Sequence, residues 1–586
     1  MNAPNWHLPF GANVIEPGRT QFRIWAPAQR RLALAIAGRS PLPMTRHDGG
    51  WFATEADCGA GTRYRYILED GTKVPDPAAR AQAGDVHGDS VVVDPASYRW
   101  RQTDWRGRPW REAVIYELHA GLLGGFNGVA RELPRLADIG FTAVELMPIA
   151  EFPGARNWGY DGVLPYAPES SYGSPDELKA LIDAAHQHRL MIFLDVVYNH
   201  FGPDGNYLHL YAPQMFRDDL ATPWGPALDF RCKEVRRFFV ENALYWLIEY
   251  RFDGLRFDAV HAICDPTWLD EMAAEVRRTI EPGRHVHLVL ENDNNTARHL
   301  TGDFDAQWND DGHHVLHVLL TGEHEGYYAD YADAPAARLA RCLKEGFIYQ
   351  GEPSAYRDGV KRGTPSAALP PTAFVLFLQN HDQVGNRAFG ERLTALARAQ
   401  ALEAAIALQL LCPQIPLVFM GEDQASSSPF LFFTGHNPEL ARAVREGRRR
   451  EFARFAQFSD PQQLKRIPDP NAPETFERSR SVPHSADAEK RQSFYRRLLT
   501  LRRNEIVPRL DGARALDAQA VGPAAVLARW RLGDGAILVL ASNLAGEAVA
   551  IPPQPHRLLF SHPESAAAAA QTGRLEPYST VALLAS

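Results

Sequence analysis

The sequence predicts an α/β protein built around a (β/α)8 TIM barrel, with an N-terminal β-sandwich domain and a small C-terminal β domain. Eight apolar segments of strand length recur between residues 113 and 423, and segments of helical character separate them. On both sides of this region, short segments alternate apolar and polar residues between Gly and Pro turns. The chain of 586 residues is too long for one hydrophobic core. We therefore expect three domains, at residues 1–100, 101–511 and 512–586.

The N-terminal domain is expected to be a β-sandwich of the immunoglobulin-like or carbohydrate-binding-like type. In a strand with one buried face, apolar side chains occupy every second position. Four segments follow this alternation and end at turns, as in a small sandwich: TQFRIWAP, RLALAIAG, GGWFATEAD and TRYRYILEDG.

The eight apolar segments of the central domain predict the barrel strands. Continuous apolar runs indicate strands that are buried on both faces, as in a parallel sheet covered by helices. The segments are AVIYELH (113–119), TAVELMPI (142–149), MIFLDVVYNH (191–200), LRFDAV (255–260), VHLVLEND (286–293), AQWNDD (306–311), AFVLFLQNHD (373–382) and PLVFMGED (416–423). Polar residues cluster at their carboxyl ends, where barrel enzymes build their active sites.

Helix signals lie between these strands. Ser174 and Glu177 form a capping box at the start of SPDELKALIDAAHQH, so a helix is expected there. The segment VRRFFVENALYWLIEY carries an apolar stripe at helical spacing, which predicts a helix packed on the core. The Pro-rich residues 365–372 and the Pro- and Ser-rich residues 467–485 are expected to be loops.

The C-terminal domain is predicted from the return of short strand-like segments after about residue 512. These segments are AVLARWRL, AILVLASN, HRLLFSH and STVALLAS. Between the last two, the run Ala566–Ala570 has low complexity and is expected at the surface.

Composition and charge narrow the range of partners. The formal net charge is -9 and the pI is near 6.2, which argues against nucleic acid or an anionic membrane and fits a neutral substrate. The five cysteines lack paired spacing, so neither a disulfide framework nor a structural zinc site is expected. No signal peptide and no apolar stretch of about 18 residues is visible, so a cytoplasmic location is predicted. No cofactor is expected.

Asp258 and Arg256 are the first candidates for chemistry. Residues two apart on a strand point to the same face, so the Arg256 guanidinium lies beside the Asp258 carboxylate and favours its ionised form. An ionised carboxylate in a fixed position is what a glycosidase nucleophile requires. For this pair alone, a structural ion pair at a strand end is the alternative.

Two further carboxyl groups end predicted strands. Glu291 follows an apolar wall that can raise its pKa, so it could protonate a departing glycosidic oxygen. Asp382 follows His381; the carboxylate could favour an oxocarbenium-like transition state while the histidine donates to a sugar hydroxyl. A metal site is the alternative for this His-Asp pair, but no convergent ligand set accompanies it, so no metal is expected.

Four ordered motifs resemble the signature regions of the α-amylase superfamily, glycoside hydrolase family 13: DVVYNH, GLRFDAVH, LEND and QNHD. The resemblance implies a barrel enzyme with retaining α-glycosidase chemistry. By motif position it implies Asp258 as nucleophile, Glu291 as general acid/base and Asp382 as third carboxylate. Substrate contacts are expected at Trp158, Tyr160, His200, Trp224, Arg256, His261, His381 and Gln383.

Longer stretches resemble one family within that superfamily, the maltooligosyltrehalose trehalohydrolases: NWGYDGVLPYAPESSYG, YRFDGLRFDAVHAI, AQWNDDGHHVLHVLLTGE with GYYADY, FIYQGEPS and FLQNHDQVGNRAFGERL. The resemblance implies hydrolysis of the α-1,4-glucosidic bond beside the terminal trehalose of maltooligosyl trehalose. The products would be α,α-trehalose and a maltooligosaccharide, as part of trehalose biosynthesis. The resemblance also implies functional pairing with a maltooligosyltrehalose synthase, and it leaves the oligomeric state open.

Two stretches depart from the trehalohydrolase pattern near the expected site mouth. After the first strand the chain has AGLLGGFNGV, with no hydroxyl or carboxylate near Leu122 and Leu123. After the eighth strand it has GEDQ (421–424), where GEE and an aromatic residue are expected. These changes leave the preferred chain length and the shape of the trehalose subsites open.

Two other functions remain possible from the sequence. A glycogen-branching or debranching enzyme of the same superfamily can share the N-terminal β domain and the YELH-type first strand. A non-catalytic glucan-binding protein is the alternative from another class, but it would have no need of an acid/base pair beside Arg256. A retaining mechanism further predicts about 5–5.5 Å between the Asp258 and Glu291 carboxyl groups.

Overall fold

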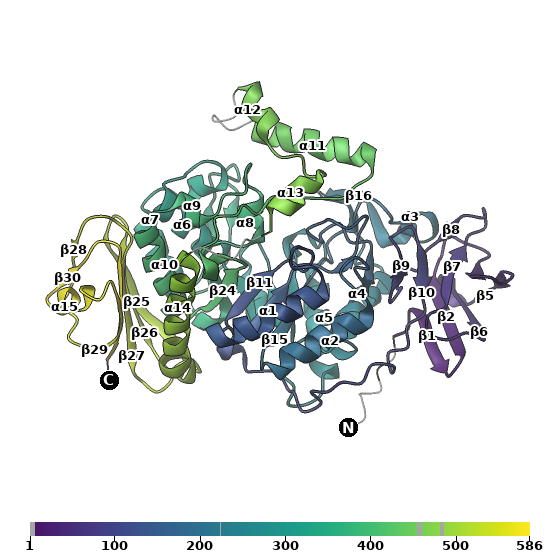
Figure 1. The fold of residues 1–586 in the computed structure, drawn as a ribbon, viewed down its shortest axis with the longest axis horizontal. Coiled ribbons are helices and arrows are strands. Elements are labelled where there is room, and N and C mark those ends of the chain that lie inside the picture. Colours follow the sequence, from purple (N-terminus) through teal and green to yellow (C-terminus); the bar gives the residue numbers. More distant parts are fainter. Residues whose placement is uncertain (1–5, 7, 223, 454–459, 481–485, 586) are drawn as a thin grey trace.

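The structure is a computed structural model that describes residues 6, 8–222, 224–453, 460–480 and 486–585. Three bodies follow one another along its longest axis (Figure 1). The N-terminal sheets lie at one end, the barrel with its helices lies in the middle, and the C-terminal sheet lies at the other end.

Eight parallel strands form a closed barrel, which confirms the predicted fold class. Each strand overlaps one of the eight predicted segments: β11 Ile115–Leu118, β12 Ala143–Leu146, β15 Met191–Val196, β18 Gly254–Phe257, β19 His287–Leu290, β20 Ala306–Trp308, β23 Phe374–Phe377 and β24 Ile415–Phe419. Every residue of these strands is buried. Burial on both faces explains why the segments are continuously apolar.

Side chains from the strands fill the interior of the barrel. A buried cluster joins Phe193, Trp308 and Phe377 to smaller residues of the other strands. Trp105, from the stretch before the first strand, belongs to the same cluster and donates its indole N–H to Asp253 at 2.8 Å. The barrel is therefore a packed core below the pocket described next.

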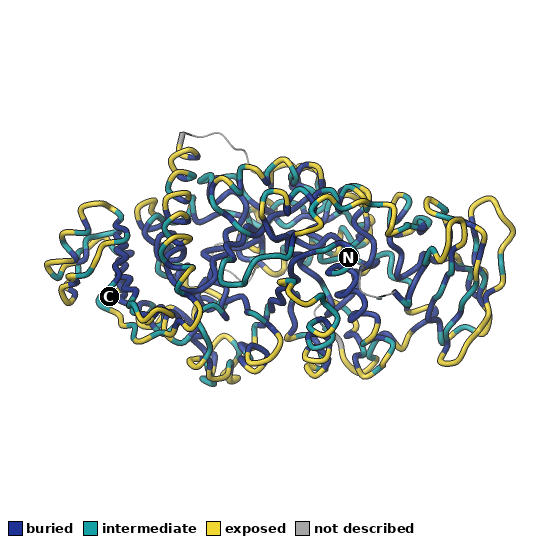
Figure 2. Tube along the Cα trace, turned by 90° about the horizontal axis from the view of Figure 1, so that it is seen from below, coloured by how far each residue is buried: buried dark blue, intermediate teal, exposed yellow. Residues whose placement is uncertain are grey.

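Helices cover the outside of the barrel, and Figure 2 shows the buried chain at the centre of this body. The longer ones are α1 Phe126–Ile139, α2 Pro175–Gln187, α4 Lys233–Ile248, α5 Pro266–Thr279, α6 Asp310–Thr321, α7 Pro335–Glu345, α10 Ala399–Leu411 and α14 Ala486–Leu501. Three more are single turns or little longer, at α3 Leu208–Tyr211, α8 His381–Gly385 and α9 Leu393–Leu396. The predicted capping box begins α2: Ser174 Oγ accepts the Glu177 N–H, and the Glu177 carboxylate accepts the Ser174 N–H at 2.7 Å.

An excursion of three helices separates β24 from α14: α11 Pro438–Phe452, α12 Pro461–Arg466 and α13 Pro473–Arg478. Figure 1 shows α11 and α12 projecting beyond the barrel. The prediction of a loop at 467–485 is wrong in part, because α13 lies within it, started by a proline at its first position. Its last residues, 481–485, lie outside the described part of the chain. The loop predicted at 365–372 contains a single 3-10 turn, Pro371–Ala373.

Two antiparallel sheets form the N-terminal body. One contains β1 Gly11–Glu16, β2 Arg19–Trp25, β5 Thr45–Arg46 and β6 Trp51–Ala56. The other contains β3 Ala33–Ile36, β4 Leu42–Pro43, β7 Arg63–Ile67, β8 Lys73–Val74, β9 Gln82–Ala83 and β10 Asp89–Val91. Phe22 of the first sheet packs edge-on against Tyr64 of the second, with ring centroids 4.8 Å apart. The four predicted segments correspond to β2, β3, β6 and β7.

A five-stranded antiparallel sheet forms the C-terminal body: β25 Arg514–Gly522, β26 Ala525–Arg531, β27 Ile537–Asn543, β29 Arg557–His562 and β31 Ser579–Ala585. A smaller pair, β28 Val549–Ala550 and β30 Arg574–Leu575, accompanies it. The expectation that Ala566–Ala570 lie at the surface is wrong in part. This run begins α15 Ala566–Gln571, and its first and last alanines, four residues apart on one helix face, are fully buried against the sheet.

The domain boundaries near residues 100 and 511 stay a prediction. Within the residues that the structure describes, no helix is both long and apolar enough to cross a membrane.

Candidate active site

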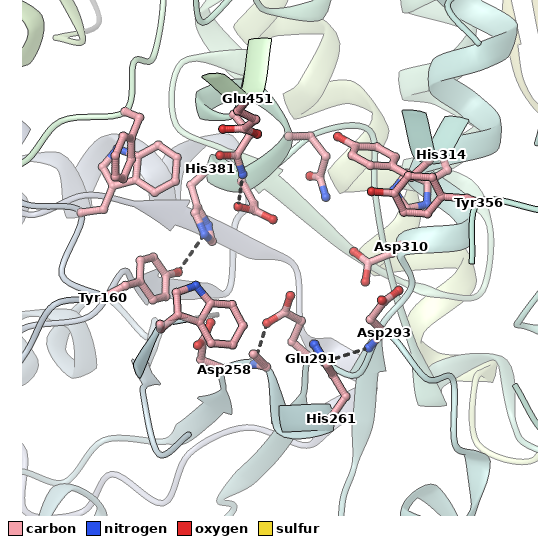
Figure 3. A pocket seen from close by; sticks show the side chains of 18 of the residues that line it. Tyr160, Asp258, His261, Glu291, Asp293, Asp310, His314, Tyr356, His381 and Glu451 are labelled. Carbon is pink, nitrogen blue, oxygen red and sulfur yellow. Dashed lines mark hydrogen bonds between the residues drawn. The ribbon is translucent and has the colours of Figure 1, made fainter. Parts of the chain in front are cut away.

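A pocket of about 630 Å³ lies at the carboxyl ends of the barrel strands. All eleven predicted site residues line it: Trp158, Tyr160, His200, Trp224, Arg256, Asp258, His261, Glu291, His381, Asp382 and Gln383. The residues come together because the carboxyl ends of all eight strands meet at one mouth. Figure 3 shows the labelled side chains around the cavity, with Asp258 and Glu291 along its floor.

Asp258 directly follows β18 and is held by two donors. Arg256 Nη1 donates to Asp258 Oδ1 at 2.8 Å, and Asn199 Nδ2 donates to Oδ2 at 2.8 Å. The guanidinium of Arg256 lies over the Trp308 ring at 4.2 Å and is itself buried. The carboxylate is thus fixed in one orientation, and 12% of its side chain stays accessible from the pocket.

Glu291 directly follows β19 and shares the same guanidinium. Its Oε2 lies 2.9 Å from Arg256 Nη2 and accepts the N–H of Ala259 at 2.7 Å. Burial raises the pKa of Glu291 well above its ordinary value, and the like charges of Asp258 and Asp310 raise it further, against the opposing effect of Arg256. A carboxyl group that retains its proton at neutral pH can serve as a general acid.

Asp382 lies in the first turn of α8. Its N–H donates to the capping Asn380 Oδ1 at 2.9 Å, and its Oδ1 accepts from Asn386 Nδ2 at 2.6 Å. Asn386 Oδ1 in turn accepts from Arg448 Nη1 of α11 at 3.2 Å. The position of this third carboxylate therefore depends on a helix cap and on the excursion that follows β24.

Tyr160 and His381 form one wall with stacked rings, 5.2 Å between centroids. The Tyr160 hydroxyl donates to Asp195 Oδ2 at 2.6 Å and lies 2.8 Å from His381 Nε2. On its other side, His381 Nδ1 donates to the carboxylate of Glu117 in β11. Asp195 also accepts from Arg256 Nη1 at 2.8 and 2.9 Å. A continuous chain of hydrogen bonds therefore runs from Glu117 to the guanidinium that holds the two acids.

Two tryptophans occupy different depths of the pocket. Trp158 is buried and stacks on Phe430, with ring centroids 5.3 Å apart. Trp224 is 45% exposed and stacks on His200, with ring centroids 5.3 Å apart. Trp158 is therefore mostly part of the core, whereas Trp224 presents an aromatic face that a sugar ring could cover.

The two other predicted contacts are polar. His261 Nδ1 accepts the N–H of Asp293 at 3.4 Å, and burial lowers the pKa of this imidazole. Gln383 is nearly buried, and its Oε1 has no hydrogen-bond partner in the described part of the protein. A neutral imidazole and a free amide oxygen suit an uncharged substrate rich in hydroxyl groups.

Asp310 is a pocket residue that sequence reasoning misses. It follows β20 at the start of α6, lines the cavity and faces the region of Asp293 (Figure 3). Burial raises the pKa of Asp310 to about 7, and the charge of Asp293 adds to this effect. Among the described residues no hydrogen bond or ion pair reaches its carboxyl group, whereas the adjacent Asp311 accepts from Arg362 at 2.8 Å. The only signal in the sequence is its place in AQWNDD, at a strand end.

The far wall of the pocket comes from the segment between α6 and β23, to which the sequence reasoning assigned no site residue. It contributes Tyr327, Asp330, Tyr331, Ser354, Tyr356, Arg357 and Arg362. Part of this wall is a short hairpin, β21 Glu352–Pro353 and β22 Lys361–Arg362. Two stretches of this segment, GYYADY (326–331) and FIYQGEPS (347–354), take part in the family resemblance, but no motif of catalytic type marks them as part of a site.

The two departing stretches do not belong to the pocket lining. Leu122 is buried in the hydrophobic core. In GEDQ, Glu422 accepts the Phe419 N–H at 2.7 Å, and Asp423 accepts from the Tyr116 hydroxyl at 2.9 Å. Both stretches therefore have structural contacts of their own, away from the acids.

No group of three or more His, Cys, Asp or Glu side chains in the described ranges is arranged to hold a metal ion. The arrangement offers one guanidinium that binds two carboxyl groups, Asp258 and Glu291, and burial raises the pKa of Glu291 well above its ordinary value. This combination can supply a nucleophile and a general acid to the same bond.

Comparisons with known proteins place the chain among glucan-active enzymes. Residues 93–214 match the family described as alpha amylase, catalytic domain, and residues 513–582 match a domain of unknown function, DUF3459. The malto-oligosyltrehalose trehalohydrolase of Deinococcus radiodurans is 41% identical over 510 residues, which cover 85% of this chain and 82% of the relative. The protein of the same name from Saccharolobus solfataricus is 42% identical over 471 residues, 78% and 82% of the two chains.

A solved structure is similar over the whole chain. It is a putative alpha amylase from Salmonella typhimurium, with 45% sequence identity and a TM-score of 0.93. The similarity covers 99% of this chain and 100% of the solved one.

Proposed function

The chain belongs to the malto-oligosyltrehalose trehalohydrolases of the α-amylase superfamily, and on that premise we propose its reaction and the residues that perform it. It is a glycoside hydrolase. It cleaves the α-1,4-glucosidic bond next to the terminal trehalose of maltooligosyl trehalose, and it releases α,α-trehalose and a maltooligosaccharide. The observation that carries the assignment of roles is that Arg256 binds both Asp258 and Glu291 at one pocket floor.

The first half of the reaction forms a covalent intermediate. Asp258 attacks the anomeric carbon of the glucose unit on the maltooligosyl side. Glu291 donates its proton to the glycosidic oxygen as the bond breaks, so that trehalose leaves with an intact hydroxyl. The maltooligosyl unit is then linked as a β-ester to Asp258. Asp382 stabilises the positive charge that develops on the sugar between bond breaking and bond formation.

The second half returns the enzyme to its starting state. Glu291, now a carboxylate, takes a proton from water, and the water oxygen attacks the anomeric carbon from the face that trehalose left. The ester bond to Asp258 breaks, and the maltooligosaccharide leaves with its original α configuration. Two inversions give net retention, which requires the two carboxyl groups to lie about 5–5.5 Å apart.

Substrate binding is proposed for the remaining pocket residues. His200, His261 and Gln383 present polar atoms to sugar hydroxyls, and Trp224 presents a ring face at the opening. Tyr160 and His381 form the wall beside the nucleophile.

The location and the partner enzyme are also proposals. All five cysteines are free, which fits the cytoplasm, where thiols stay reduced. A synthase that converts the reducing end of a maltooligosaccharide into a trehalose unit would supply the substrate.

Product analysis tests this function. The protein is incubated with maltotriosyl trehalose and, separately, with maltopentaose, and the sugars released are identified. Free trehalose and maltotriose from the first substrate, with much slower cleavage of the second, are expected. New α-1,6 branches would instead identify a branching enzyme, and binding without any cleavage would identify a glucan-binding protein.

A further inference from the structure

Glu117 is a buried carboxylate that the double displacement does not use. It lies in β11, is 1% exposed and does not line the pocket. Both of its oxygens contact one residue: Oε2 accepts the backbone N–H of His381 at 3.1 Å, and Oε1 accepts from His381 Nδ1. The two residues are 264 positions apart in the chain, so this contact exists only in the closed barrel.

The hydrogen bonds around His381 require two ring protons. A carboxylate has no hydrogen to give, so the proton between Glu117 and His381 resides on Nδ1. The Tyr160 hydroxyl has one hydrogen, and at 2.6 Å from Asp195 Oδ2 it donates to that carboxylate. The Tyr160 oxygen must therefore accept at its 2.8 Å contact with His381, which places a second proton on Nε2.

We propose that Glu117 is a positioning residue that holds His381 as an imidazolium, and that the imidazolium fixes the Tyr160 hydroxyl on Asp195. Asp195 and Asp258 share Nη1 of Arg256, so the orientation of Tyr160 is transmitted to the guanidinium that carries the nucleophile. The role in catalysis rests on the proposed function, whereas the protonation state does not.

Charges alternate along this chain of contacts. Glu117 is negative, His381 positive, Asp195 negative, Arg256 positive and Asp258 negative. Each charge in this series therefore has a neighbour of opposite sign, and the three inner charges have one on both sides. Removal of the first charge would take away the anion that contacts the imidazolium directly, and a buried cation without its partner is costly in a low-dielectric interior.

Titratable groups from four sources face His381. They are Glu117 of β11 with His119 just after it, Asp195 of β15, Arg256 of β18 and Asp382 on the same helix; Tyr160, from the loop between β13 and β14, adds its hydroxyl. Burial lowers the pKa of His381, but the charge and hydrogen bond of Glu117 and the charge of Asp382 outweigh this effect, and the pKa is raised. Arg256 acts in the opposite direction.

Neutron diffraction measures the protonation state directly. In deuterium-exchanged crystals of the wild-type protein at neutral pH, deuterium is expected on both Nδ1 and Nε2 of His381 and on the Tyr160 hydroxyl, directed at Asp195. A single ring deuteron, or a deuteron on Asp195, would overturn the proposal. This measurement needs no substrate, so its outcome is independent of whether the reaction is the one proposed above.

Glu117→Gln tests the consequence for catalysis. Glutamine keeps one acceptor, for Nδ1, but loses the charge and the second acceptor, for the His381 backbone N–H. His381 therefore becomes neutral, and Tyr160 is free to donate to Nε2 instead of to Asp195. We expect kcat for maltotriosyl trehalose to fall by up to about 10⁴-fold, the loss seen when a carboxylate that sets the state of a catalytic imidazole is neutralised. The KM should change little. The loss should grow as pH rises, and Glu117→Asp should restore part of the rate.

Glu145→Gln is the matched control. Glu145 lies beside Glu117 on β12, in direct register, and is equally buried. Burial raises the pKa of Glu145 well above its ordinary value, so glutamine replaces a neutral acid there. Wild-type rates are expected. Equal losses in both variants, or wild-type kcat in Glu117→Gln, would count against a specific role for Glu117; if Glu117→Gln does not fold, the diffraction result and Glu117→Asp decide.

Discussion

Arg256 shows how much of the pocket depends on the geometry of one side chain. Its Nη1 binds Asp195 and Asp258, and its Nη2 binds Glu291. A planar guanidinium can present separate N–H groups to several carboxyl groups in fixed directions, which a lysine ammonium cannot do. The same guanidinium also lies over the Trp308 ring, so a ring contact orients it in addition to the three carboxyl groups.

Asp258→Asn is expected to abolish turnover while leaving sugar binding intact. The amide occupies the same volume but cannot form the glycosyl ester, so kcat should fall by about 10⁴-fold or more. Initial rates on maltotriosyl trehalose and calorimetric titration with a maltooligosaccharide measure the two properties. Asp303→Asn, at an exposed aspartate outside the pocket, is the control. Near-native rates in Asp258→Asn would show that the nucleophile is another residue.

Asp310→Asn is expected to shift the pH dependence of catalysis. The charge of Asp310 raises the pKa of Glu291, so its removal lowers that pKa. In the proposed mechanism Glu291 is protonated when trehalose leaves, so kcat/KM should fall as pH rises through its pKa. The basic limb of the kcat/KM profile should move to lower pH in the variant, and the acidic limb should move less. An unchanged basic limb would mean that Asp310 does not influence the acid.

At the scale of secondary structure, the sequence predicts where the strands lie better than it predicts which side chains of different strands meet. Burial on both faces makes a strand continuously apolar, and this pattern is visible in the sequence. All eight barrel strands were predicted from it. The polar residues at the strand ends were predicted because they directly follow these apolar runs. The contact between Glu117 and His381 could not be predicted, because it joins the first barrel strand to the start of α8, after the seventh strand, across 264 positions.

The errors at this scale occur where the local sequence carries only a weak signal. Composition predicted a loop where a proline starts α13, and a surface run where two alanines meet the C-terminal sheet. In both places the sequence is rich in residues without a strong hydrophobic pattern, so the tertiary contacts decide the structure.

Ser174→Ala tests how much the predicted capping box of α2 contributes to the stability of the protein. Loss of the capping box at α2 leaves N–H groups of the first turn without their partners, and a cost of about 1 kcal/mol is expected. Urea denaturation monitored by tryptophan fluorescence measures the change, and Ser40→Ala, at an exposed serine, is the control. Activity should be unchanged, since α2 is outside the pocket lining. A midpoint equal to that of Ser40→Ala would show that the cap contributes nothing.

At the scale of the whole molecule, the C-terminal sheet packs on barrel helices far from the pocket. Trp530 of β26 is fully buried and donates its indole N–H to the Leu343 carbonyl of α7 at 3.2 Å. Thr580 of β31 donates to the Ala404 carbonyl of α10 at 2.7 Å. The sheet therefore supports the helices on one side of the barrel without contributing to the pocket lining.

Trp530→Ala should separate stability from activity. A large buried ring is removed, so destabilisation of about 3–5 kcal/mol is expected. Calorimetry should record a lower unfolding temperature, while kcat at low temperature stays near the wild-type value. Leu516→Ala, at a partly exposed position of the same sheet, should change neither property. A large fall in kcat for Trp530→Ala would indicate that the sheet also shapes the pocket.

The filled interior of the barrel closes the active-site pocket on the side of the amino ends of the strands. Phe193, Trp308 and Phe377 occupy the space behind the acids, so neither sugar can leave through the far end of the barrel. Both products must depart by the route along which the substrate arrived. In the proposed double displacement the glucan stays covalently attached to Asp258 after the first step, so the order of release follows: trehalose first, the shortened chain second.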